Sequence, residues 1–129
     1  MNGYLLDTNV VLQATATPER LTSRARAAIK KGPVFLSVIS YWEVMVKAMR
    51  GSLDVGDTRD WWRETVDDLG LQALLFRPEH VAAIYHLPPI HQDPFDRALI
   101  AQATVEGLAL VTTDSEIPKY GSDRFQVIR

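Results

Sequence analysis

The chain has 129 residues, of which 47% are hydrophobic and 23% charged, and this composition predicts one globular domain over residues 1–129. It contains no cysteine, which excludes a disulfide framework, a thiolate nucleophile and a cysteine-ligated zinc site. The 14 basic and 16 acidic residues give a net charge of −2, so any binding of nucleic acid needs a local basic patch or bound cations rather than bulk positive charge.

The N-terminal segment has the pattern of neither a signal peptide nor a membrane span. No basic stretch precedes its apolar residues, Tyr4–Leu6, and Asp7 ends the run at once. The absence of cysteine also fits a reducing compartment. We therefore expect a soluble cytoplasmic protein with no membrane contact.

Short apolar runs alternate with longer segments of helical periodicity, and glycine or proline stands at many of the boundaries. In chain order, this pattern predicts a strand at Tyr4–Leu6, a helix at Pro18–Lys31, a strand at Val34–Leu36, helices at Ser37–Arg50 and Asp57–Leu69, a strand at Leu71–Phe76, helices at Pro78–His86 and Pro94–Glu106, and strands at Leu108–Val111 and Phe125–Ile128. Such alternation favours an α/β fold with a parallel sheet covered by helices on both faces. Ligands of these sheets gather at the carboxyl ends of the strands.

Two aspartates follow predicted strands. Asp7 comes directly after the first strand, and Asp114 comes shortly after the strand Leu108–Val111. Each also has a structural interpretation, because aspartate is favoured at helix N-caps and in Asx-turns. A place at the carboxyl edge of the sheet makes both of them candidate ligands.

Glu43 lies in a predicted helix that is apolar on nearly every side. A carboxylate in such surroundings is costly unless it meets a cation or a hydrogen-bond donor, which favours a functional role. The alternative is an exposed glutamate that pairs with Lys47, its i+4 neighbour.

The segment His91-Gln92-Asp93-Pro94-Phe95-Asp96-Arg97 opens the next helix. Asp93 is explained as the N-cap and Pro94 as the first helical residue. Asp96, in the first turn, interacts favourably with the helix dipole, but its position also directs it toward the carboxyl edge of the sheet. His91 is a loop histidine that we leave out of the predicted site.

These acids are expected at one edge of one sheet, where bare carboxylates would repel each other. A divalent cation relieves this repulsion, and a ligand set without histidine or cysteine suits Mg²⁺ or Mn²⁺. Such an ion can bind a phosphodiester, supply a water-derived nucleophile and stabilise the leaving oxygen. Phosphodiester hydrolysis is therefore the reaction that the residues favour.

Four segments of the chain together resemble the PIN-domain nucleases, and among these the VapC-type toxins of bacterial toxin–antitoxin pairs: Leu5-Leu6-Asp7-Thr8-Asn9, Trp42-Glu43, His91 to Arg97 with the helix that follows, and Leu110-Val111-Thr112-Thr113-Asp114. The resemblance implies a three-layer α/β/α sandwich with a mostly parallel sheet, Mg²⁺- or Mn²⁺-dependent endoribonuclease activity on RNA, and inhibition by a cognate antitoxin.

The resemblance also assigns site residues. It implies that the catalytic and metal-binding acids are Asp7, Glu43, Asp96 and Asp114. The metal would lie chiefly against Asp7 and Asp96. Asn9 and Thr112 match polar positions that support the site in members of the family.

Three basic residues lie close in sequence to these acids and are our candidates for binding substrate phosphates: Lys47, Arg50 and Arg97. The helix Ser37–Arg50 is too apolar for a surface helix. Core packing explains most of these apolar residues. Two further hypotheses are that they form a homodimer contact or a groove for the antitoxin.

Other functions stay open from the sequence. A housekeeping PIN-type RNA-processing nuclease would share every motif described above. A haloacid-dehalogenase-like phosphatase would need a second acid where the chain has Asn9. A non-enzymatic Mg²⁺-binding regulatory module of the receiver type would need an adjacent acidic pair near the N-terminus and a lysine after a late strand.

Overall fold

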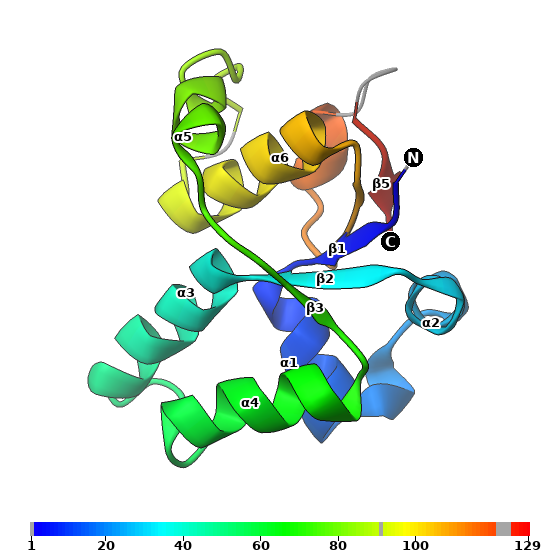
Figure 1. The fold of residues 1–129 in the computed structure, drawn as a ribbon, viewed down its shortest axis with the longest axis vertical. Helices are drawn as coiled ribbons and strands as arrows, with labels where there is room; N and C mark the ends of the chain where they lie inside the picture. Colours follow the sequence, from blue (N-terminus) through cyan, green and yellow to red (C-terminus); the bar gives the residue numbers. More distant parts are fainter. Residues whose placement is uncertain (1, 91, 121–124) are drawn as a thin grey trace.

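A computed structural model describes residues 2–90, 92–120 and 125–129, in which the apolar runs form one parallel sheet (Figure 1). Its strands are β1 (Tyr4–Leu6), β2 (Val34–Ser37), β3 (Gln72–Leu74), β4 (Ala109–Val111) and β5 (Val127–Ile128). Their order across the sheet is β3-β2-β1-β4-β5, and all four neighbouring pairs are parallel. All five predicted strands are present, although β3, β4 and β5 are shorter than predicted.

The described helices are α1 (Thr8–Ala16), α2 (Ser23–Lys31), α3 (Val38–Met49), α4 (Thr58–Asp68), α5 (Pro78–Ile84) and α6 (Pro94–Glu106), with 3₁₀ turns η1 (Pro18–Arg20) and η2 (Ile117–Tyr120). Figure 1 shows α5 and α6 on one side of the sheet and α1 and α4 on the other. The strands alternate accordingly: Tyr4 and Leu6 belong to the core under α1, α2 and α4, and Leu5 belongs to the core under α6. The predicted three-layer α/β/α sandwich is confirmed.

The order of the strands explains where a ligand could bind. The chain leaves β3 at one edge of the sheet and returns as β4 on the far side of β1. The carboxyl ends of β1 and β4 therefore lie side by side, with Leu6 paired to Val111. This reversal of strand order is the place where parallel sheets form ligand crevices.

Helix α1 was not predicted. Its first turn contains Thr8, Asn9, Val10 and Val11, all of which are weak helix formers. Val10 and Val11 are fully buried against the sheet, and Asp7 caps the helix by accepting a hydrogen bond from the backbone N–H of Val10 (2.8 Å). Packing and capping outweigh the low helix propensity.

The predicted helix Pro18–Lys31 is divided. The 3₁₀ turn η1 ends at Arg20, and Leu21 adopts an extended backbone that buries its side chain in the core. Thr22 then caps α2, because its hydroxyl oxygen accepts a hydrogen bond from the N–H of Ala25 at 3.1 Å. A buried leucine followed by a threonine cap thus interrupts the helical pattern.

Helix α3 contacts both layers at the carboxyl edge of the sheet. Ser37, the last residue of β2, caps it through a hydrogen bond from the N–H of Ile39 (2.9 Å). Ile39 packs into the core under α6, and Val44 packs into the core on the opposite face. The helix therefore lies between α1 and α6, and it holds Glu43 between them.

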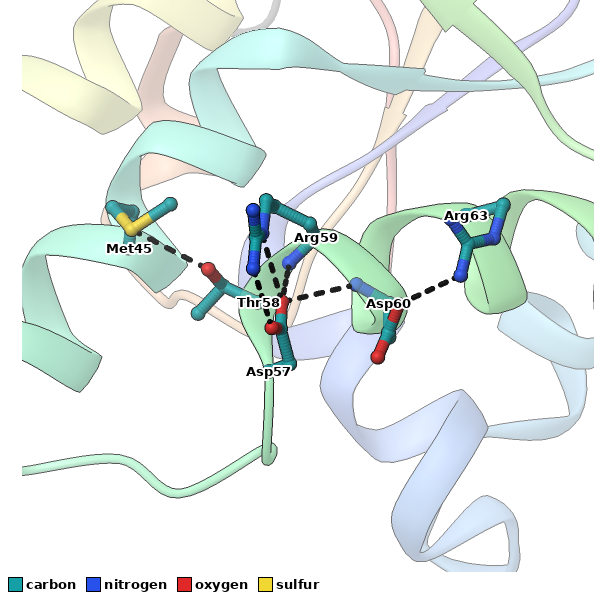
Figure 2. Close-up of polar contacts among 6 residues, drawn as sticks. All are labelled: Met45, Asp57, Thr58, Arg59, Asp60 and Arg63. Carbon is teal, nitrogen blue, oxygen red and sulfur yellow. Dashed lines mark hydrogen bonds and ion pairs between the residues drawn. The ribbon is translucent and has the colours of Figure 1, made fainter.

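The start of α4 carries a series of ion pairs away from this edge (Figure 2). Asp57 caps the helix, and its carboxylate also pairs with Arg59 at 2.9 Å, which lowers the pKa of Asp57 to about 2. Arg63 pairs with Asp60 at 2.6 Å. These side chains are exposed, so their charges are explained by a solvated helix start.

None of the described helices is long and apolar enough to cross a membrane.

Candidate active site

A cavity of about 210 Å³ opens where β1 and β4 end, and polar residues form almost all of its lining. The lining residues are Asp7, Thr8, Asn9, Glu43, Lys47, Asp93, Asp96 and Asp114. All four acids predicted from the sequence are among them. They come from the end of β1, from α3, from the first turn of α6 and from the loop after β4.

Asp7 is buried, and all hydrogen-bond donors that the described part of the chain offers its carboxylate are neutral. The N–H of Val10 donates to Oδ1 at 2.8 Å, and the hydroxyl of Thr112 donates to Oδ2. Burial raises the pKa of Asp7 to about 6, although these hydrogen bonds offset part of the effect. Asp7 therefore caps α1, as one interpretation of the sequence has it, and it also lines the cavity; its role as a metal ligand stays a prediction.

Thr112 joins two of the acids. Besides donating to Asp7, its hydroxyl oxygen accepts a hydrogen bond from the backbone N–H of Asp114 at 3.0 Å. Asp114 in turn accepts from the N–H of Glu116 at 2.7 Å, which forms an Asx-turn after β4. Thr112 is buried, so the loop that carries Asp114 is fixed to the end of β1.

Glu43 has partners at both carboxylate oxygens. The hydroxyl of Thr8 donates to Oε1 at 2.6 Å, and Nζ of Lys47 lies 2.8 Å from Oε2. The hydroxyl oxygens of Thr8 and Ser40 lie 3.0 Å apart. The sequence left two alternatives for Glu43: a buried acid with a functional role, or an exposed acid paired with Lys47. In the structure Glu43 is buried in the cavity lining and is also paired with Lys47.

Asp93 is a cavity residue that the sequence analysis assigned only to capping. Its Oδ1 accepts hydrogen bonds from the N–H groups of Phe95 (2.8 Å) and Asp96 (3.2 Å), which confirms the cap. The same side chain lines the cavity next to Asp96. The sequence contained a signal for this placement. Asp93 precedes Asp96 by three residues, and residues with this spacing at the start of a helix can face the same crevice.

The three predicted phosphate-binding residues lie in different places. Lys47 lines the cavity, whereas Arg50 is an exposed residue at the end of α3. The Arg97 guanidinium donates to the carbonyl oxygens of Pro88 (3.0 Å) and Ile84 (3.3 Å). It lies in a different hollow, beside the end of α5. Substrate binding by Lys47, Arg50 and Arg97 stays a prediction.

Asn9 and Thr112 were predicted to support the site. The exposed Asn9 lies in the cavity lining, and Thr112 lies directly behind Asp7. His91, which the sequence analysis left out of the site, lies outside the described residues.

The donor set fits a hard divalent cation, because the acids supply oxygen ligands and the described lining contains no histidine or cysteine. Within residues 2–90, 92–120 and 125–129, no three acidic or histidine side chains are close enough to enclose an ion. Mg²⁺ is usually held by one or two carboxylates and keeps several waters, so it does not need such a cage. The chemistry of the cavity therefore fits Mg²⁺ or Mn²⁺.

The PIN-domain family profile matches residues 4–122, which include every residue of the cavity lining. The chain belongs to the PIN-domain family. Strands β1 to β4 and the acids at the carboxyl edge of the sheet lie within the matched residues. No curated protein sequence matches the chain at a significant level.

Several solved structures share this fold over nearly the whole length of the chain. DNA-bound VapBC from Salmonella typhimurium has a chain 17% identical to this one, with 98% of each chain covered and a TM-score of 0.68. FitAcB from Neisseria gonorrhoeae is 20% identical, with 98% and 96% covered and a TM-score of 0.65. VapBC-5 from Mycobacterium tuberculosis is 17% identical, with 100% and 99% covered and a TM-score of 0.64. At these identities the likeness establishes the fold.

Proposed function

We propose that this PIN domain is a Mg²⁺- or Mn²⁺-dependent endoribonuclease and the toxin of a toxin–antitoxin pair. One observation carries the proposal: the four acids that the family resemblance assigns to catalysis line one cavity, at the reversal of strand order. Scattered carboxylates are brought together there by β1, α3, α6 and the loop after β4.

Asp7 and Asp96 would hold the cation, with Glu43 and Asp114 beside them. When bound, the cation supplies the means to bind a phosphodiester, activate water and stabilise the leaving oxygen. The chain itself contributes the orientation of the acids. Thr112 and the N–H of Val10 fix the Asp7 carboxylate, and Lys47 offers a positive charge to substrate phosphates at the rim of an acidic cavity.

The toxin role is supported by the structural neighbours, which are complexes of toxin–antitoxin systems. It also fits the exposed apolar side chains of α3. Trp42 is 58% exposed and Met49 is 80% exposed, and large apolar side chains on a surface helix mark a face for a protein partner. An antitoxin segment or a second copy of the chain would cover them.

The experiment is an RNA cleavage assay with the purified chain. We expect cleavage that requires Mg²⁺ or Mn²⁺ and stops when the ion is chelated, with phosphomonoesters left intact. Asp96→Asn should lower the rate about a hundredfold or more. Asp67→Asn on the exposed face of α4 is the matched control and should cleave at the original rate. Cleavage by Asp96→Asn at the rate of the control would refute the proposal.

A further inference from the structure

We propose that Lys47 is a built-in counter-ion of the acidic cavity, and that it takes the cation position beside Glu43. The cavity then binds one divalent cation, on the Asp7 side, rather than two. This inference rests on the proposed metal-dependent activity and specifies how the chain prepares its site for the ion.

The contacts of Glu43 carry the inference. Its carboxylate has two oxygens, and each has a strong partner: the ammonium of Lys47 at 2.8 Å on Oε2 and the hydroxyl of Thr8 at 2.6 Å on Oε1. The Glu43 side chain is only 8% exposed, so water does not compete freely for these oxygens. Each oxygen keeps a second lone pair, but a metal ion bound there would lie close to the Lys47 ammonium, which carries charge of the same sign.

The surroundings of Lys47 make this pair different from an ordinary surface pair on a helix. An exposed i,i+4 pair is weak because water screens both charges. Here the ammonium borders a cavity that four aspartates also line, and it is the single basic residue among the described lining residues. A cation brought next to Glu43 would meet the positive charge of Lys47 at close range.

Asp7 differs from Glu43 in this respect. The donors around its carboxylate are the Thr112 hydroxyl and the backbone N–H groups of Val10 and Thr113, none of which carries a charge. A buried carboxylate with neutral donors still gains from a cation, whereas Glu43 already has one. The partners therefore distinguish Asp7, whose donors in the described structure are neutral, from Glu43, whose charge Lys47 already offsets.

The test counts Mn²⁺ ions bound to the full chain without RNA, by calorimetry and by electron paramagnetic resonance of free Mn²⁺. We expect one ion per chain, with Asp7→Asn weakening its binding at least about tenfold. Glu43→Gln leaves the Lys47 charge without its partner and should weaken binding too, but less than Asp7→Asn does. Lys47→Met should admit a second ion or tighten binding about tenfold. Lys47→Arg keeps the charge and should behave like the original chain.

Lys31→Met, an exposed lysine on α2, is the matched control and should not alter Mn²⁺ binding. Two ions of similar affinity in the original chain would overturn the inference. A folded Lys47→Met variant that binds Mn²⁺ like the control would also overturn it. So would a Glu43→Gln variant whose affinity for Mn²⁺ is as low as that of Asp7→Asn. If the predicted Mn²⁺ pattern is found but RNA is not cut, the proposed function alone fails. If RNA is cut and two ions bind, this inference alone fails.

Discussion

The hydroxyl of Thr112 donates a hydrogen bond to Asp7 Oδ2, although the two residues are 105 positions apart in the chain. The pairing of β1 with β4 brings them together, with Leu6 opposite Val111 immediately before them. Because the same hydroxyl accepts from the N–H of Asp114, one side chain orients two acids of the cavity. Thr112 is therefore a positioning residue of the proposed site.

Replacing this hydroxyl tests that role. Thr112→Val keeps the shape of the side chain but leaves Asp7 Oδ2 without this donor and the N–H of Asp114 without this acceptor. We expect RNA cleavage to fall about 10- to 100-fold and the free energy of unfolding to fall by about 1–3 kcal/mol. Thr112→Ser retains the hydroxyl and should keep most of the cleavage rate and most of the free energy of unfolding. Cleavage by Thr112→Val within twofold of the original rate would contradict the assigned role.

The pH dependence of stability should carry the signature of Asp7. Its pKa is about 6 in the folded chain, against 3.8 for an unperturbed aspartate, so the folded state binds the proton more tightly. The stabilisation from protonated Asp7 is fully present below about pH 4 and is lost as the pH rises through 6. For the metal-free chain this loss amounts to about 3 kcal/mol.

Denaturant unfolding at several pH values checks this prediction. In Asp7→Asn the side chain cannot ionise. Between pH 4 and 7 the unfolding free energy of this variant should therefore fall by about 3 kcal/mol less than that of the original chain. Asp68→Asn, an exposed residue at the end of α4, is the control and should keep the pH profile of the original chain. Identical pH profiles for Asp7→Asn and Asp68→Asn would show that burial does not perturb Asp7.

The sequence predicted the sheet better than the helices. The five strands and their parallel pairing follow from apolar runs separated by helical segments, and these signals are local. The missed helix α1 depends on the burial of Val10 and Val11 against the sheet, a tertiary effect that outweighs weak helix propensity. The break at Leu21 has the same origin, since its burial interrupts a helical pattern.

Asp7, Asp96 and Asp114 were predictable candidates because strand ends and helix starts mark the carboxyl edge of a parallel sheet, whereas Glu43 was a candidate because its helix is otherwise apolar. Other features depended on three-dimensional contacts. Asp93 had a sufficient local explanation as a cap, which concealed its place in the cavity. The Arg97 side chain follows the acidic motif directly but turns toward the carbonyl groups at the end of α5, and no sequence signal shows this.

Arg97 should prove more important for stability than for binding phosphates. Its guanidinium donates to the carbonyl oxygens of Ile84, Leu87 and Pro88, so it fixes the segment between α5 and α6. We expect Arg97→Met to lower the free energy of unfolding by about 1–3 kcal/mol, because these carbonyl groups lose a donor. Arg50→Met, which changes an exposed side chain, should stay within about 0.5 kcal/mol of the original chain.

Cleavage kinetics of the same two variants separate the alternatives. If Arg97 binds substrate, as its sequence position suggested, Arg97→Met should raise KM for RNA while the unfolding free energy stays unchanged. That result would contradict the structural role assigned here.

The exposed apolar face of α3 should be an association surface. Met49 is 80% exposed, so Met49→Asp does not disturb the core, but it places a charge on this face. We expect the original chain to sediment as a dimer at micromolar concentration and Met49→Asp as a monomer. Leu75→Asp, at a 62% exposed residue after β3, is the control and should remain dimeric. A monomer mass for the original chain that does not change with concentration would exclude the homodimer.

The central claim is that carboxylates from four parts of the chain form one site for a divalent cation. The most direct measurement is the anomalous difference density of a crystal of the chain grown with Mn²⁺. We predict one strong peak inside the cavity, within coordination distance of Asp7 and Asp96. A well-ordered crystal with no manganese peak between these side chains, or with its manganese bound only elsewhere, would contradict the account.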